Sequence, residues 1–390
     1  MKPMRLVLRL AAAATAFFLW VLPATAFAQT IGANVQNQLQ TLNDHGLNQA
    51  LNRLVEGSHG VTLPSIGQVT KDLIHRQNPF DPSLLLKGLE RALLGDFNQM
   101  ARILGILFIL AVFAALLERL AESTEVPEVV RIARWVVLSA FITVGLRSFA
   151  TALSSVHQMV SSLVHLMESM IPTVIVLMAG SGALASAGIF HPIMLATINL
   201  IAVLTKNWVL PAMMLATVVE LVGYWLPRFS LGNLASLFRQ IGLTLLGGLM
   251  TVFLGVMAVE GAAGSVADGV LLRSSKFLSG TFVPVIGKAV SDAMEAVLGS
   301  SLLLKNAVTL VGALAIIVLV AFPLLKLMVM MFLYRVAASA AEPLAVDGMT
   351  KSLNTMATAI GWLVGIGGAV ALMFFLIVTV VLSASNGVLP

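Results

Sequence analysis

The sequence predicts an all-α, polytopic helical membrane protein, because long apolar runs dominate it. Of its 390 residues, 58% are hydrophobic and 11% are charged, and the mean hydropathy is +0.97. The stretch from Leu302 to Met331 holds only two charged residues, Lys305 and Lys326. A water-soluble domain needs more polar surface, whereas a membrane-spanning helix needs about 20 mainly apolar residues. Lipid is therefore the expected environment of most of the chain.

The first 28 residues have the three parts of a signal peptide. Lys2, Arg5 and Arg9 form a basic start, an apolar stretch follows over residues 10–22, and Ala26-Phe27-Ala28 fits the small-x-small cleavage rule. We expect cleavage after residue 28. The alternative is an uncleaved first membrane anchor.

Residues 29–97 are expected to form a short, exported helical region, which follows the signal peptide and so lies outside the cytoplasm. Apolar residues recur at helical spacing between residues 35 and 54, and predict one amphipathic helix. Ile66, Val69 and Leu73 predict a second, shorter helix, and Ser83 is a candidate N-cap for a third.

Residues 98–390 are expected to form the multi-pass domain. The candidate spans are Ala101–Leu117, Trp135–Leu153, Met170–Ile189, Ile193–Leu204, Trp208–Leu226, Ile241–Val259, Asn306–Phe322, Leu324–Ala338 and Ile360–Leu382. Several are shorter than the ~17 residues of a full crossing, so we expect about six to eight true crossings.

Basic residues predict the orientation of the first crossings. The linker 118–134 carries three arginines, whereas the linker 154–169 carries neither Lys nor Arg. Because cytoplasmic loops are enriched in Lys and Arg, linker 118–134 is expected inside and linker 154–169 outside. Arg228 and Arg239 suggest one further cytoplasmic loop.

An internal repeat is a second feature of this domain, over about residues 165–260 and 277–382. One order of motifs occurs twice, as Ile171-Pro172, Lys206-Asn207 and Pro227, and as Val283-Pro284, Lys305-Asn306 and Pro323. Such repeats build many transporter folds. The alternative is chance similarity between glycine-rich apolar helices.

Three charged residues interrupt the candidate spans, namely Glu220, Arg147 and Lys326. Ionisable groups are costly in hydrocarbon, so each is a candidate functional residue. One hypothesis pairs Glu220 with Arg147 or with Lys326 to gate a polar path. The alternative is a structural ion pair, with the basic side chains extending to the interface.

Pro284 is expected to begin a helix with a polar stripe, because proline suits the first helical position. Lys288, Asp292 and Glu295 are spaced to share one face of that helix. The stripe is a candidate lining of an aqueous cavity or a contact for a soluble partner. The alternative is an interfacial helix lying along the bilayer.

Glycines mark candidate packing positions between membrane helices. Gly361 and Gly365 form a GxxxG pattern in an apolar segment, and Gly247 and Gly248 are a second candidate pair. Glycine lets two helix backbones approach closely in lipid. Packing within the chain is favoured here over dimerisation.

No enzymatic motif occurs, so we expect neither catalysis nor a cofactor. The sequence lacks HExxH, the Walker A loop, GxSxG and the EF-hand loop, and it has no cysteine. Its six histidines show no metal-ligand spacing. No basic and aromatic cluster typical of nucleic-acid binding is present, so a nucleic-acid partner is not expected.

Four sequence segments carry a family resemblance. They are F-x-P-V-x-G at Phe282–Gly287, S-D-A at Ser291–Ala293, L-L-K-N-A-V at Leu303–Val308 and A-F-P-L-L-K at Ala321–Lys326. With the order of signal peptide, exported helical region and multi-pass portion, they resemble the stage III sporulation protein AE family of endospore-forming bacteria.

The resemblance implies a role in sporulation. It implies the polytopic component of a secretion-like channel complex between mother cell and forespore, needed for late forespore development and sigma G activity. The implied partners are the other proteins of the stage III sporulation A set and the forespore protein Q. The implied location is the mother-cell-derived outer forespore membrane. No catalytic residue is implied.

Two other functions fit the residues. A stand-alone secondary transporter would use Glu220 as a proton or cation site, and a non-conducting scaffold would only organise partner proteins. Replacing Glu220 with Gln is expected to abolish proton-coupled transport and to have little effect on a scaffold.

Overall fold

The computed structural model describes residues 64–74, 101–117, 119, 127–180, 184–225, 231–282, 284–344 and 347–383. The signal peptide predicted at 1–28 lies outside the described residues, as do the amphipathic helix predicted between 35 and 54 and the helix expected after Ser83.

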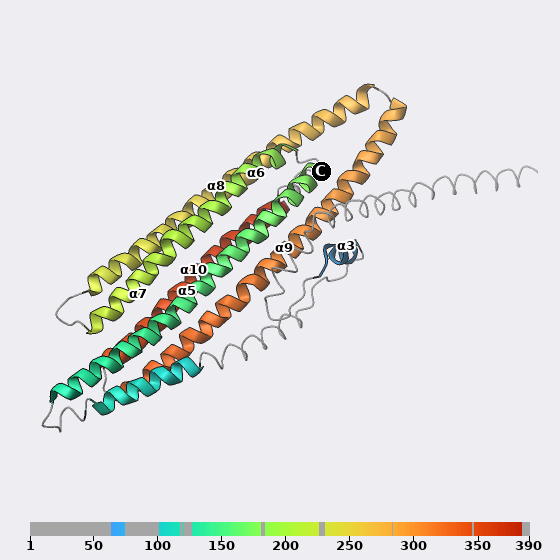
Figure 1. Cartoon of the computed structure of the whole chain (residues 1–390). Helices are drawn as coiled ribbons and strands as arrows, with labels where there is room; N and C mark the ends of the chain where they lie inside the picture. The colour runs from blue at the N-terminus through green and yellow to red at the C-terminus, as the bar shows by residue number, and fades with distance from the viewer. Residues whose placement is uncertain are drawn as a thin grey trace, which may run out of the picture.

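The described part of the chain is all helical, as the sequence predicted (Figure 1). Its elements in chain order are α3 (Ile66–Ile74), the helix Ala101–Leu117, α5 (Pro127–Gly180), α6 (Leu184–Leu204), the π-helical turn η1 (Thr205–Val209), α7 (Leu210–Trp225), α8 (Gly232–Phe282), α9 (Pro284–Ala341), the 3₁₀ turn η2 (Glu342–Leu344) and α10 (Asp347–Ser383).

The short helix predicted around Ile66 is present as α3, and it packs against α9. Its first turn is fixed by a capping box. The Ser65 backbone N–H donates to the Gln68 side-chain oxygen at 3.1 Å, and the Gln68 N–H donates to the Ser65 hydroxyl at 3.2 Å. Ile66 and Val69 are fully buried, so apolar burial holds the helix in place.

The long helices lie side by side in one elongated bundle (Figure 1). Consecutive long helices run in opposite directions, so the start of α5, the end of α7 and the starts of α8 and α10 lie at one end of the bundle. Linker 118–134 and the segment around Arg228 were both predicted to be cytoplasmic. The start of α5 and the end of α7 lie at the same end of the bundle, and the side of the membrane that this end faces stays a prediction.

Several helices are longer than a bilayer is thick. α5 has 54 residues and α9 has 58. At a rise of 1.5 Å per residue, helices of this length extend over roughly 80 Å, against about 30 Å of hydrocarbon. Part of each helix therefore projects beyond the hydrocarbon core.

Five described helical segments are long and apolar enough to span a membrane. They are Trp135–Ala179, Phe190–Trp225, Gly232–Val259, Leu302–Ala341 and Gly348–Val380. The helix Ala101–Leu117 is apolar but shorter. The protein is thus a multi-pass membrane protein, and the five described spans are one fewer than the lower bound of the six to eight crossings expected.

The predicted external linker at 154–169 is wrong, because those residues lie in the middle of α5. Its serines misled the prediction, since they occupy one side of a continuous helix rather than a loop. The predicted span Met170–Ile189 is also wrong, because α5 ends at Gly180 and a separate helix, α6, begins at Leu184.

Two further predicted breaks are also absent. α6, η1 and α7 follow one another without interruption through Lys206, which separated two predicted spans. α9 continues through Pro323, which separated two others. In lipid, neighbouring helices and local rearrangement satisfy the backbone groups that an internal proline frees, so a proline does not end the helix.

The two predicted repeats each contain a helical hairpin, formed by α6 to α8 in one and by α9 and α10 in the other. The matched motifs nevertheless occupy different places. Pro172 lies inside α5, whereas Pro284 begins α9. The motif correspondence therefore does not extend to equivalent structural positions.

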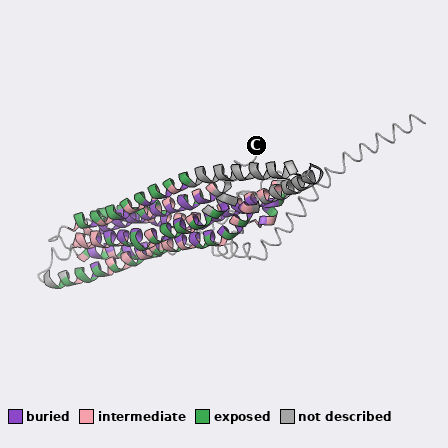
Figure 2. Cartoon of the chain, turned by 90° about the horizontal axis from the view of Figure 1, so that it is seen from above, coloured by how far each residue is buried: buried purple, intermediate pink, exposed green. Residues whose placement is uncertain are grey.

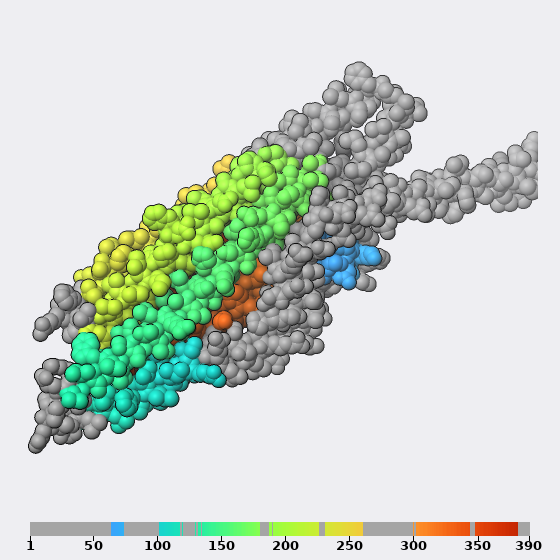
Figure 3. Space-filling model, in the orientation of Figure 1, coloured from blue at the N-terminus to red at the C-terminus, as the bar shows by residue number. Residues whose placement is uncertain are grey.

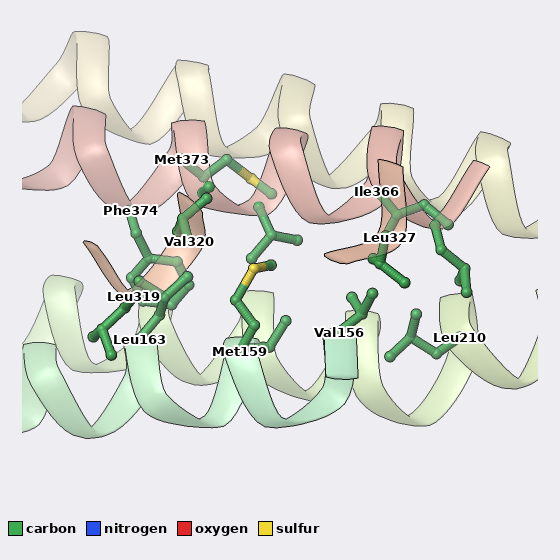
Figure 4. Close-up of a cluster of buried hydrophobic side chains, with 14 of the residues drawn as sticks. Val156, Met159, Leu163, Leu210, Leu319, Val320, Leu327, Ile366, Met373 and Phe374 are labelled. Atoms are coloured by element: carbon green, nitrogen blue, oxygen red, sulfur yellow. The ribbon is translucent and has the colours of Figure 1, made fainter. Parts of the chain in front are cut away.

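The core runs along the bundle interior, and exposed residues lie on the outer faces (Figure 2). Figure 4 shows part of this core, where Met159 and Leu163 of α5 lie near Leu319 of α9 and Phe374 of α10. All four side chains are at most 6% exposed. α5, α9 and α10 therefore share a continuous packed interior, and α8 packs mainly on α6 and α7 at one edge.

Candidate functional site

A polar cluster lies where α7, α8 and α10 meet, near the end of the bundle that holds the α7–α8 connection. Glu220 is in the last two turns of α7, and Arg239 is in the first three turns of α8. The Arg239 guanidinium donates to Glu220 Oε2 and forms an ion pair with it. The side chains are 28% exposed for Arg239 and 22% exposed for Glu220, so the pair is largely shielded.

Two hydroxyl groups complete the cluster. The Tyr224 hydroxyl donates to Glu220 Oε1 at 3.2 Å, and it lies 2.8 Å from the Thr355 hydroxyl of α10. The Thr355 hydroxyl is also 3.4 Å from Glu220 Oε1. Thr355 is buried, at 7% exposure. Glu220 Oε1 is therefore hydrogen-bonded to the two hydroxyl groups, and Glu220 Oε2 is bonded to the Arg239 guanidinium.

This arrangement explains why a carboxylate is tolerated among apolar helices. A charge removed from water is stable only when it is paired and hydrogen-bonded, and Glu220 has both kinds of partner. The cluster also joins three helices that are distant in sequence. It ties α8, which packs at the edge of the bundle, to α7 and α10.

The structure changes the predicted partner of Glu220. The sequence hypothesis paired it with Arg147 or Lys326, whereas its ion pair is with Arg239. Arg147 lies exposed on α5, and Lys326 is partly buried on α9. Glu220 lies near the end of its helix, because α7 ends at Trp225.

A second polar cluster lies halfway along the helix formed by α6, η1 and α7. Lys206 lies in η1, and its ammonium group donates to the Ser161 hydroxyl of α5 at 2.9 Å. Ser161 in turn donates to the backbone oxygen of His157 at 3.0 Å. All three side chains are partly buried. This cluster places a cation deep between two apolar segments.

The π-helical turn is itself unusual. π-turns inside α-helices are rare and often occur at functional sites. Beside Lys206, the Thr205 hydroxyl is buried and makes no hydrogen bond within the described part of the chain. Buried polar atoms normally have partners, so this turn is a candidate functional element.

The polar stripe predicted after Pro284 lies at the start of α9. The helix begins at Pro284, as predicted. The backbone of Lys288, Asp292 and Glu295 is helical, and their side chains lie outside the described part. Their role as a cavity lining or partner contact stays a prediction.

The four predicted packing glycines differ from one another. A Cβ at Gly361 would lie 3.1 Å from the Met331 sulfur, so α10 approaches α9 closely there. Gly247, Gly248 and Gly365 have open space around them, within the described structure. Of these four glycines, only Gly361 therefore lies close to a side chain of another described helix.

No group of three or more His, Asp or Glu residues that could hold a metal ion occurs in the described ranges. Sequence reasoning missed Arg239, Tyr224 and Thr355, as well as Lys206 with Ser161. Lys206 carried a usable signal, because apolar stretches begin just beyond Thr205 and Asn207 and no glycine or proline lies beside it.

Comparison with known proteins identifies relatives along most of the chain. Residues 64–385 match the family described as stage III sporulation protein AE. One relative, the stage III sporulation protein AE of Bacillus subtilis (strain 168), is 32% identical over 315 residues, which cover 81% of this chain and 79% of the relative. No solved structure matches.

Proposed function

This chain belongs to the stage III sporulation protein AE family, and we propose that it is the polytopic membrane component of a secretion-like channel complex between mother cell and forespore. Its proposed partners are the other proteins of the stage III sporulation A set and the forespore protein Q. In this role it supports late forespore development and sigma G activity.

The observation that carries the proposal is the family match over residues 64–385, which includes all five long apolar helices. A protein of this kind contributes a membrane-embedded wall or anchor rather than catalysis, so we propose no enzymatic activity. The proposed location is the outer forespore membrane, with the N-terminal region outside the mother-cell cytoplasm.

The ion pair of Glu220 supports a role in the complex more than it supports a stand-alone transporter. A proton- or cation-coupled site needs a carboxylate that exchanges its partner, whereas Arg239 already neutralises this one. Glu220 is also near a helix end rather than at mid-membrane depth. We therefore assign the cluster to holding helices together.

Affinity purification from sporulating cells tests the proposal. A functional, epitope-tagged chain is expressed in place of the native one, crosslinked in the membrane and purified, and an unrelated tagged multi-pass protein is the control. Recovery of the stage III sporulation A proteins and protein Q only with the tagged chain is expected. Purification of the chain alone, from cells that sporulate normally, would contradict the proposal.

A sigma G reporter in the same cells provides the second measurement. Deletion of the chain is expected to abolish the reporter signal in engulfed forespores, and Glu220→Gln is expected to retain most of it. A Glu220→Gln variant that folds normally but behaves like the deletion would favour the transporter instead.

A further inference from the structure

One face of α5 is polar along its middle, although the flanking parts of the helix are apolar. Polar residues recur there at every third or fourth position. This polar stripe consists of Arg147, Thr151, Ser154, Gln158, Ser161, His165 and Glu168. Residues at this spacing share one side of a helix. All of them are exposed except Ser161, which is partly buried, and Figure 3 shows α5 along the visible surface of the molecule.

The stripe lies at the depth of the hydrocarbon. Gly145 of α5 lies against Met356 of α10, and Met159 of α5 lies against Gly367 of α10. α5 and α10 therefore run parallel at the same level. Residues 352–380 of α10 contain no Asp, Glu, Lys or Arg, so the stripe lies beside an apolar stretch long enough to cross the hydrocarbon.

The length of the stripe matches a bilayer. From Arg147 to Glu168 the helix rises roughly 32 Å at 1.5 Å per residue, against about 30 Å of hydrocarbon. A polar face that covers the full thickness differs from a polar patch at one interface. It needs a polar surrounding along its whole length.

The hydroxyl groups alone do not require water. Thr151 donates to the backbone oxygen of Arg147 at 3.0 Å, and such internal bonds let a hydroxyl lie in lipid. The charged and amide side chains of the stripe cannot satisfy their polar groups by such bonds to the backbone of their own helix. Gln158 lies near the middle of the stripe, where lipid tails do not solvate an amide, and Arg147 and Glu168 place charges near its two ends.

A second helix adds to the stripe between its middle and its Glu168 end. Lys206 donates to Ser161, so the π-turn brings a cation to a point closer to Glu168 than to Arg147. At the far end, His165 Nδ1 lies 3.5 Å from the Glu168 carboxylate. The face therefore carries charges of both signs at separate depths, which lipid tails do not solvate.

We propose that several copies of this chain surround a water-filled path across the membrane, lined by the polar stripe of α5 and by Lys206. This inference rests on the proposed role in a channel complex, and it names the residues that face the aqueous path. The path carries water and small hydrophilic solutes.

Charge layout favours water over a dry contact between the copies. Copies in one membrane share one orientation, so stripes pressed together would place Arg147 against Arg147 and Glu168 against Glu168. Like charges in close contact are unfavourable, and water between them screens the repulsion.

Cysteine accessibility tests the water path, because the native chain has no cysteine. Thr151→Cys, Ser154→Cys and Gln158→Cys are each exposed to a charged, membrane-impermeant methanethiosulfonate in intact membranes. We expect all three to react within about tenfold of Ser181→Cys, between α5 and α6. The controls Val252→Cys on α8 and Leu372→Cys on α10, where the native side chains are 53% and 46% exposed, are expected to react at least a hundredfold more slowly. Stripe positions as slow as these controls would overturn the proposal.

Crosslinking tests the enclosure by further copies. Gln158→Cys is treated in membranes with flexible bis-maleimides of increasing length, and a dimer-sized product is expected, whereas Leu372→Cys gives none. Water access without any crosslinked dimer would overturn the enclosure by copies of this chain. If the path is accessible and crosslinks form, but no sporulation partner co-purifies, the proposed function fails while the path stands.

Discussion

α10 and α8 are both long apolar helices, yet they sit in the bundle in different ways. In the most apolar window of α10, 50% of the residues are buried inside the molecule, against 28% in α8. α10 packs against α9, α5 and α7, and α8 packs mainly on α7 and α6. Similar composition therefore gives a central helix in one case and an edge helix in the other.

Their glycines show the same contrast. A Cβ at Gly367 of α10 would lie 2.9 Å from Leu324 and 3.1 Å from Met159, whereas Gly247 and Gly248 of α8 have nothing within 4 Å. Apolar character decides that a helix enters the membrane. Which of its faces is buried depends on the neighbours, because lipid and protein interior are equally apolar.

The largest expected effect is the difference in stability loss between two Leu→Ala variants. Leu363→Ala on α10 removes a fully buried side chain, and Leu254→Ala on α8 removes one that is 47% exposed. Cavity formation in a core costs about 2–5 kcal/mol for Leu→Ala, and we expect the lower half of that range in lipid, where the transfer term is small. Leu254→Ala is expected to stay within about 0.5 kcal/mol. Denaturation by SDS titration measures both, and equal losses would remove the distinction between the two helices.

The second effect concerns glycines. Gly367→Leu is expected to destabilise the protein by about 1–3 kcal/mol, because the new side chain enters space held by Leu324 and Met159. Gly248→Leu is the matched control on α8 and is expected to change little. Stability against heating, followed by size-exclusion chromatography in detergent, compares the two. A harmless Gly367→Leu would show that α10 and its neighbours are not packed as described.

The polar cluster at the bundle end is expected to hold α8 in place. Glu220→Ala leaves Arg239 unpaired, and the loss is expected to be about 1–3 kcal/mol, between the values for exposed and fully buried pairs. Combining Glu220→Ala with Arg239→Ala is expected to cost less than the sum of the two single changes. Strict additivity in this double-mutant cycle would contradict a direct interaction.

The smallest expected effect is a gain in stability. Gly248→Ala fills open space and improves helix propensity, so it is expected to raise stability by up to about 1 kcal/mol. Gly361→Ala is the contrasting change, because Met331 must move to admit the methyl group. The same SDS titration ranks them, and a loss at Gly248 as large as the loss at Gly361 would place α8 against a neighbour.

The fold class and family were predictable from the sequence, whereas the helix boundaries were not. The long apolar runs predicted the fold class, and the four sequence motifs predicted the family. The breaks placed at residues 154–169, at Lys206 and at Pro323 were wrong, because each was inferred from local polarity or from a proline. A helix in lipid continues through such residues when its backbone bonds are satisfied and its polar side chains face one side.

The candidate site was predictable in part. Glu220 stands out because a carboxylate is costly in an apolar segment. Its partners Arg239 and Thr355 lie on other helices, and only the packing of α7 against α8 and α10 brings them together. The residues of the polar stripe on α5 were visible in the sequence. That they share one face became clear only when residues 154–169 proved to be helical.

Side-specific labelling at the two ends of the α6–α7 helix tests the central claim, that the chain crosses the membrane as long uninterrupted helices. Ser181→Cys precedes α6, and Ser230→Cys follows α7. With an impermeant maleimide on sealed vesicles of known orientation, the account predicts that the two cysteines react from opposite sides. Reaction of both from the same side would place a break near Lys206 and contradict it.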